Sequence, residues 1–181
     1  EVVIPEKRTK TACTVCVGIP TYNRDDVLLQ TLNEVFAQTR VPDEVIVFDQ
    51  NAGHSPKITD ELSKLRDQRS IRLLKGTEPS LTAARNKILQ ASCSDVTIFI
   101  DDDTLLPPEF VEQCVINFKK HAVVCLQCQI HHRRDGFEFG TLDRANPNRG
   151  CFPQFPETEF HGRHSLLHGC HAVKRDIAIS V

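Results

Sequence analysis

The chain is 181 residues long, 40% of them hydrophobic and 25% charged, with a formal net charge of -2 at neutral pH. This length suits one domain with a substantial core. The composition is that of ordinary globular proteins, and without a long basic segment it predicts no nucleic-acid partner. The longest apolar runs, such as Val45–Phe48 and Val96–Ile100, are far too short to form a membrane-spanning helix.

The sequence contains eight cysteines, which raises the question of disulfides or zinc. Cys13 and Cys16 have Cys-x-x-Cys spacing, as do Cys125 and Cys128, and both pairs lie in runs typical of strands. Residues three apart on a strand point to opposite faces, so such a pair cannot easily share one metal. We therefore predict buried thiols of a reducing compartment, with zinc binding as the alternative. Because the sequence has no methionine, we expect it to be incomplete.

Strands and helices are predicted to alternate along residues 14–130. Apolar runs predict strands at Thr14–Ile19, Glu44–Phe48, Ile71–Leu74, Val96–Ile100 and Ala122–Ile130. Helical spacing of apolar residues, with Ser55 and Ser80 as N-cap candidates, predicts helices at Asp25–Gln38, Pro56–Leu65, Leu81–Leu89 and Pro107–Phe118. This alternation indicates an α/β domain with a mostly parallel central sheet flanked by helices. Residues 133–163 lack a period and predict loops, and His168–Val173 is predicted as one more strand.

Polar residues follow three of the predicted strands. The first strand runs into Pro20-Thr21-Tyr22-Asn23-Arg24, the second ends at Asp49, and the fourth runs into Asp101-Asp102-Asp103. In open α/β sheets, ligands bind at the carboxyl ends of the strands, near the point where the strand order reverses. If these strands are neighbours, their ends line one crevice.

Three consecutive aspartates after a buried strand repel one another unless something offsets their charge. A divalent cation with oxygen ligands is a natural partner. Mg²⁺ or Mn²⁺ needs only one or two carboxylates together with phosphate oxygens, and it would neutralise charge on a departing diphosphate. The alternative is an acidic loop that caps the following helix.

Other residues at this edge allow two interpretations each. Asp49 could accept a hydrogen bond from a base N–H, or it could bond its own turn. Tyr22 could stack on a base or cover the end of its strand. Arg85 could point a cation at the crevice or lie exposed on its helix. His168 or His171 is a further candidate to approach the metal.

Four segments, in order along the chain, resemble family 2 glycosyltransferases. They are Val-Gly-Ile-Pro-Thr-Tyr-Asn-Arg (17–24), Glu-Val-Ile-Val-Phe-Asp (44–49), Leu-Thr-Ala-Ala-Arg-Asn (81–86) and Phe-Ile-Asp-Asp-Asp-Thr (99–104). The resemblance covers roughly Thr14 to His121. It implies a Rossmann-like A-type fold, a nucleotide-diphospho-sugar donor, usually linked to uridine diphosphate (UDP), and a Mn²⁺ or Mg²⁺ cofactor. It also implies transfer with inversion, in which one carboxylate base deprotonates the acceptor hydroxyl.

The resemblance also assigns roles to individual residues. The implied donor-binding residues are Pro20, Thr21, Tyr22, Arg24, Asp49, Arg85, Asp101 and Asp102. The first three would line the base pocket, and Asp49 would hold the base. Asp101 and Asp103 would form the Asp-x-Asp metal pair, while Arg85 would face the donor phosphates or steady the aspartates.

Two departures from the family pattern are visible. In the family, the base follows a segment resembling Gly169–Ile177, so we expect it, and the acceptor-binding region, beyond Val181. We therefore interpret residues 1–181 as a single donor-binding domain, truncated before the acceptor region. The turn at Gln50–Ser55 is longer than the usual Asp-Gly-Ser turn, which leaves the ribose contacts unassigned.

The function predicted from the sequence is an inverting, metal-dependent glycosyltransferase that uses a nucleotide-sugar. The acceptor is expected to be a glycan or a lipid-linked glycan, as in polysaccharide biosynthesis. We expect a cytoplasmic location, with peripheral association at the inner face of a membrane left open. A non-catalytic nucleotide-sugar-binding module is the main alternative. A sugar nucleotidyltransferase is less favoured, because Pro20–Asn23 is not the Gly-rich phosphate loop of that class.

Overall fold

The computed structural model describes residues 13–121, 123–127 and 170–180 of the chain. The strands are β1 (Val15–Thr21), β2 (Glu44–Asp49), β3 (Arg72–Lys75), β4 (Val96–Phe99), β5 (Cys125–Gln127) and β6 (His171–Lys174). The helices are α1 (Asp25–Phe36), α2 (Pro56–Asp67), α3 (Leu81–Ala91), α4 (Phe110–Lys120) and α5 (Arg175–Ile179).

The strands form one sheet in the order β3-β2-β1-β4-β6-β5. β1 pairs in parallel with both β2 and β4, and β2 pairs in parallel with β3. β6 is antiparallel to both β4 and β5. The predicted α/β class with a mostly parallel sheet is thus confirmed. The strand order reverses between β1 and β4, which is the position where such sheets bind ligands.

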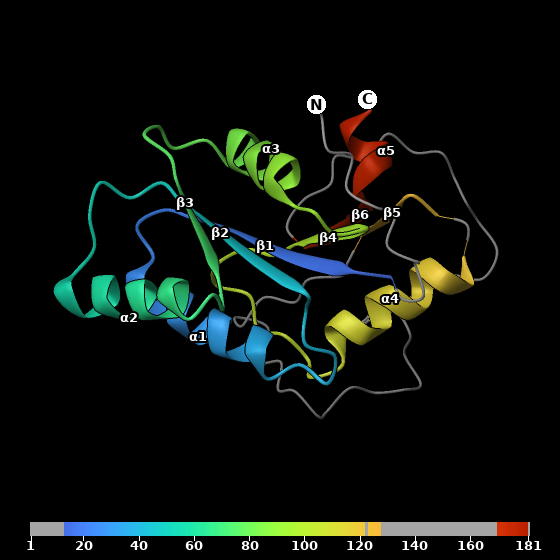
Figure 1. Cartoon of the computed structure of the whole chain (residues 1–181), viewed down its shortest axis with the longest axis horizontal. Helices are drawn as coiled ribbons and strands as arrows, with labels where there is room; N and C mark the ends of the chain where they lie inside the picture. The colour runs from blue at the N-terminus through green and yellow to red at the C-terminus, as the bar shows by residue number, and fades with distance from the viewer. Residues whose placement is uncertain (1–12, 122, 128–169, 181) are drawn as a thin grey trace, which may run out of the picture.

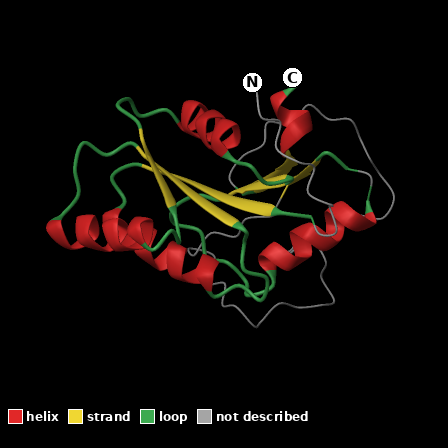
Figure 2. Cartoon of the chain, in the orientation of Figure 1, coloured by secondary structure: helices red, strands yellow, loops and turns green. Residues whose placement is uncertain are grey.

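Helices cover both faces of the sheet: α1, α2 and α4 lie on one side, and α3 and α5 lie on the other (Figure 1, Figure 2). The larger core fills the first interface, and β1 contributes Val15, Val17 and Ile19 to it. Cys16 points to the smaller core on the other face, whereas Cys13 packs against the larger one. This pair therefore lies on opposite faces, as its spacing predicts. Burial raises the pKa of the Cys16 thiol to about 12.

Helix α3 packs directly onto the backbone of β1 at Gly18. A Cβ added at this position would lie 2.4 Å from Ile88 Cγ2, far inside van der Waals contact. Glycine within a strand often marks such a close approach of another segment. Because α3 also carries Arg85, this contact helps to set the height of that side chain above the sheet.

The structure differs from the sequence-based expectation in a few elements. Helix α4 begins at Phe110, not at Pro107, because Pro107 first accepts a bond from the Phe110 amide and closes a turn. Strand β6 begins at His171, three residues later than predicted, and the short helix α5 was not predicted. Residues 128–169, which include the last three residues of the predicted fifth strand, the predicted loops and His168, lie outside the described residues. In the part of the chain that the structure describes, no helix is long and apolar enough to cross a membrane.

Candidate functional site

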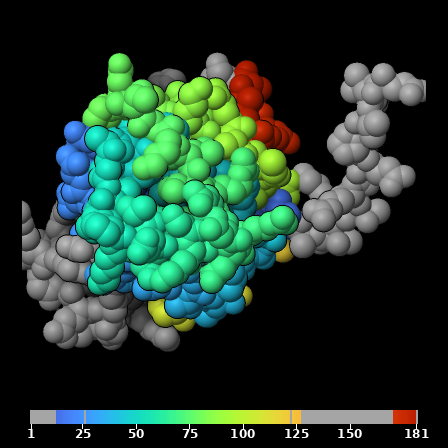
Figure 3. All heavy atoms as spheres, turned by 60° about the vertical axis from the view of Figure 1, so that its left-hand side comes forward, coloured from blue at the N-terminus to red at the C-terminus, as the bar shows by residue number. Residues whose placement is uncertain are grey.

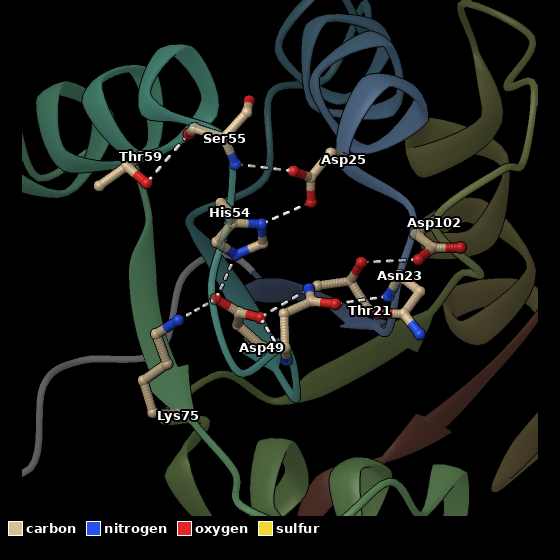
Figure 4. Close-up of polar contacts among 10 residues, drawn as sticks. Thr21, Asn23, Asp25, Asp49, His54, Ser55, Thr59, Lys75 and Asp102 are labelled. Atoms are coloured by element: carbon tan, nitrogen blue, oxygen red, sulfur yellow. Dashed lines mark hydrogen bonds and ion pairs between the residues drawn. The ribbon is translucent and has the colours of Figure 1, made fainter.

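The segments that follow β1, β2 and β4 meet at the carboxyl edge of the sheet (Figure 4). Thr21, the last residue of β1, is in register with Asp49, the last residue of β2. On its other side, the Thr21 hydroxyl donates to Asp102 Oδ2 over 2.7 Å. The three strand ends that the sequence singled out are therefore neighbours, as the predicted crevice requires.

The middle residue of the aspartate triplet points into the protein. Asp102 is buried, and its backbone carbonyl accepts a second bond from the Thr31 hydroxyl at 2.8 Å. Burial raises the pKa of Asp102, the Thr21 bond opposes this, and the net shift is upward. Asp102 thus links the end of β4 to β1 and α1 and does not face the solvent.

The two outer aspartates are exposed, and each pairs with one of the arginines that the sequence predicted. Asp101 is 37% exposed, and its Oδ1 lies 3.0 Å from Nη2 of Arg85 on α3. Asp103 is 47% exposed, and its Oδ2 lies 3.2 Å from Nη1 of Arg24, just before α1. Two carboxylates and two guanidinium groups therefore gather at the end of β4. The exposed Arg85 of the alternative interpretation is not observed, because only 14% of its side chain is accessible.

Three further residues that the sequence predicted for the site are Pro20, Tyr22 and His171. Pro20 is buried within β1, whereas Tyr22 is exposed. His171 is buried in β6, and its ring lies 5.0 Å from the ring of Phe99, centroid to centroid. Of these, Tyr22 is the side chain with a surface available for stacking on a ligand.

The donor set fits a hard divalent cation that shares its ligands with a bound diphosphate. Asp101 and Asp103 offer the two carboxylates that Mg²⁺ or Mn²⁺ commonly takes from a protein, with phosphate and water oxygens completing the shell. Among the described residues, no group of three or more His, Cys, Asp or Glu side chains is placed to hold a metal. The described residues thus do not fit a closed structural zinc site of four protein ligands.

Asp49 lies at the predicted edge, but its carboxylate is covered by protein groups. Its side chain is 0% exposed. Oδ1 accepts from the backbone amide and the side-chain amide of Asn51, both at 2.9 Å, and Oδ2 contacts His54 and the Lys75 ammonium. Burial raises the pKa of Asp49, but these bonds outweigh it and the net shift is downward. The structure therefore shows the turn-bonding alternative for this residue, and its contact with a base stays a prediction.

His54 was not singled out by sequence reasoning, although it lies in the unusually long turn after β2. Its Nδ1 lies 2.6 Å from Asp25 Oδ1 and its Nε2 lies 2.6 Å from Asp49 Oδ2, with 4% of the side chain exposed. Burial lowers the pKa of His54, but the bonds to the two carboxylates outweigh it and raise the pKa above 6.5. The irregular turn was the one signal that could have pointed to it.

Side-chain bonds join the loops after β1 and β2 at two places (Figure 4). The first is Asp25–His54, and the second is a bond from the Asn23 amide to Asn51 Oδ1. Asn23 has a φ of 56°, a left-handed conformation that asparagine tolerates better than most residues. In the space-filling view, the start of α1 (blue) lies beside the segment leading into α2 (teal) (Figure 3).

A mostly parallel sheet with a strand-order reversal, followed by an aspartate triplet at the end of β4, defines a Rossmann-like domain of the A-type glycosyltransferase class. A family model described as "Glycosyl transferase family 2" matches residues 16–181. The chain belongs to glycosyltransferase family 2. Among curated proteins, no significant match to the chain is found.

Several solved structures share this fold. Glucosyl-3-phosphoglycerate synthase from Mycobacterium tuberculosis, in complex with Mn²⁺ and UDP, is 18% identical with a TM-score of 0.61, over 95% of this chain and 60% of that one. The mannosyltransferase PcManGT from Pyrobaculum calidifontis, in complex with GDP-Man and Mn²⁺, is 21% identical with a TM-score of 0.58, over 97% and 50%. Residues 1–349 of S. aureus TarS, in complex with UDP-GlcNAc, are 20% identical with a TM-score of 0.54, over 65% and 34%. The chain thus spans less than two thirds of the length of each.

Proposed function

We propose that the protein binds a nucleotide-diphospho-sugar, most often a UDP-sugar, together with Mn²⁺ or Mg²⁺, and transfers the sugar to an acceptor hydroxyl with inversion. The observation that carries this proposal is the placement of Asp101 and Asp103. Both carboxylates project from the end of β4 at the strand-order reversal, and each lies beside an arginine. Acidic oxygens next to guanidinium groups are suited to a site that receives a metal and a diphosphate together.

The proposed roles of the individual residues are those that the family resemblance implies. Pro20, Thr21 and Tyr22 would form the base pocket, with the exposed Tyr22 ring available for stacking. Arg24 and Arg85 would donate to phosphate oxygens from the positions where they now flank the two aspartates. Bound there, the cation would supply charge neutralisation to the leaving diphosphate.

The proposal is supported by the ligands of the similar structures, which are UDP, UDP-GlcNAc and GDP-Man, with Mn²⁺ in two of them. The finer points rest on the family alone. These are the choice of uridine, a glycan or lipid-linked acceptor, inversion, and association with a membrane surface. No described residue is assigned as the catalytic base.

Calorimetric titration of UDP tests the proposal directly. We expect binding in the presence of Mn²⁺ and its loss when a chelator is added. Asp103→Asn should abolish the metal-dependent binding, whereas Asp67→Asn, the same change at an exposed position on α2, should leave it intact.

The outcomes separate the alternatives. Equal UDP affinity with Mn²⁺ and with chelator would refute the metal role, and wild-type affinity in Asp103→Asn would exclude this residue as a ligand. Failure to bind either UDP or GDP would refute the donor site. Metal-dependent binding without sugar transfer would favour the non-catalytic module.

A further inference from the structure

Four charged side chains form a compact network between the segments that follow β1 and β2 (Figure 4). Asp25 begins α1, Asp49 ends β2, His54 lies in the following turn, and Lys75 ends β3. The His54 ring contacts both aspartates at 2.6 Å, and Lys75 contacts Asp49. Of these four residues, only Asp49 is among the donor-binding residues that the family resemblance implies.

The geometry requires both nitrogens of His54 to carry protons. A neutral imidazole has one N–H and one nitrogen lone pair. In a neutral ring between two ionised carboxylates, that lone pair would face and repel one of them. As an imidazolium it donates to both. Two negative carboxylates are then balanced by the imidazolium and by the Lys75 ammonium, which leaves the network neutral.

The network joins two loops that are also linked by the Asn23–Asn51 bond and by a bond from the Gln50 amide to the Thr21 carbonyl. Asp25 follows directly on residues 20–24, and its Oδ2 also accepts from the Ser55 amide at 3.1 Å. On the other loop, Ala52 and Gly53 are exposed, and no atom lies within 4 Å of a Cβ added at Gly53. Without the imidazolium, the carboxylates of Asp25 and Asp49 would face each other across the gap that the ring now fills.

We propose that His54 is a positioning residue for donor binding: its imidazolium holds the loop after β1 against the loop after β2, so that the base pocket is formed before the nucleotide arrives. The inference rests on the proposed function, since it assumes that these two loops contact the nucleotide. When the pocket is already ordered in the free protein, no binding free energy is lost in ordering it, so the nucleotide binds more tightly.

Donor affinity should therefore depend on the protonation of His54. Its pKa is raised, so the bridge is complete below the ordinary value of 6.5 and is lost as the pH rises through the raised value. The pKa of Asp25 is lowered: burial raises it, but the bond from His54 outweighs that effect, so this carboxylate stays ionised throughout the range. Among the described residues, Asp49 of β2 also contacts the ring, and Lys75 of β3 contacts Asp49.

The test compares UDP affinities of His54→Gln with those of a matched control, His121→Gln, at the distant end of α4. Glutamine is polar but cannot donate as a cation to both carboxylates. The ratio of the two dissociation constants at each pH cancels the titration of the UDP phosphate itself. We expect a ratio of about ten near pH 6 that falls toward one as the pH rises through the raised pKa of His54 and the ring in the control loses its proton.

A second variant keeps His54 but changes its pKa. Asp25→Asn removes one charged partner, so the pKa of His54 should fall and UDP affinity should be lost at a lower pH than in Asp60→Asn, a control on the exposed face of α2. Following the ring nitrogens of His54 by NMR gives its pKa directly in both proteins. This arm remains decisive if His54→Gln fails to fold.

Coincidence of the His54 titration with the loss of UDP affinity, and a shared shift in Asp25→Asn, would support the inference. UDP binding by His54→Gln as tight as by the control at every pH would overturn it and leave the donor site standing. So would an Asp25→Asn variant in which the NMR titration moves and the affinity profile does not. Absence of UDP binding by the wild type at every pH would overturn both proposals.

Discussion

Gly18→Ala places a methyl group where α3 rests on β1. The added Cβ would lie 2.4 Å from Ile88 Cγ2 and 3.5 Å from Phe99 Cδ1, whereas carbon atoms pack best at about 3.5–4.0 Å. Phe99 can therefore stay in place, but the Ile88 side chain must move away from the added methyl group. This movement is unfavourable because the side chain is fully buried against the sheet. Overpacking of this kind costs about 1–3 kcal/mol of stability. For a chain of this size, each kcal/mol lowers Tm by about 2–4 °C.

Urea unfolding of Gly18→Ala, Ile88→Ala and the double variant isolates this contact. Ile88→Ala alone should cost about 2–5 kcal/mol through the cavity that it leaves. In the double variant Cγ2 is absent. The nearest side-chain atom left at position 88 is Cβ, which lies 3.6 Å from the new methyl group, an ordinary contact. We therefore expect the double variant to be about 1–3 kcal/mol more stable than the sum of the two single effects. Strictly additive costs would show that α3 does not rest on the Gly18 backbone as described.

Three other changes test separate parts of the site and its support. Thr21→Val removes the hydroxyl that donates to the buried Asp102 and should lower the free energy of unfolding by about 1–3 kcal/mol, with recovery in Thr21→Ser; no loss in urea unfolding would contradict the bond. Gln38→Ala removes the side chain that bonds Pro107 O at 2.8 Å and the Val111 amide at 3.0 Å, and it should lower Tm at a cost of about 1–3 kcal/mol. An unchanged Tm would argue against that link to α4. Because the pKa of His54 is raised, the free energy of unfolding should fall as the pH rises from 6.5 through the raised value, and His54→Gln should lack this slope.

The parallel half of the sheet was predictable because its signals are local. β1, β2 and β4 are mostly apolar runs, β3 carries two adjacent leucines, and each of these strands is followed by a helix with regular apolar spacing. The polar residues after β1, β2 and β4 could be assigned to one edge for the same reason, since parallel neighbours end on the same side. The Gly18–Ile88 contact, by contrast, depends on how α3 crosses the sheet, which no local pattern records.

The orientation of each acidic side chain was not predictable. Asp101, Asp102 and Asp103 are the same residue type, yet only the middle side chain turns inward. The Thr21 hydroxyl of β1 binds its carboxylate, and the Thr31 hydroxyl of α1 binds its backbone carbonyl. Asp49 is covered for a similar reason: its partners come from the adjoining turn and from β3. Contacts between side chains distant in sequence decide these cases.

The direction of β6 and the existence of α5 were also beyond the sequence signals. A buried strand shows the same apolar run whether it pairs in parallel or antiparallel. Helix α5 spans Arg175–Ile179 and has no buried residue, so it lacks the apolar period by which a helix is recognised. Its short length leaves room for little more than one turn.

The position of β6 between β4 and β5 has a consequence for the order of folding. β5 precedes β6 in the chain but lies outside it in the sheet, so β5 cannot join the sheet until β6 has entered between β4 and β5. Residues 96–99 of β4 therefore present an apolar, unpaired edge from the time they are synthesised until residues 171–174 arrive. Such edges can pair with other chains. A late, long-range strand insertion is also a slow kind of folding step. The nascent protein is thus most exposed to aggregation in that interval, while the parallel half of the sheet has already assembled.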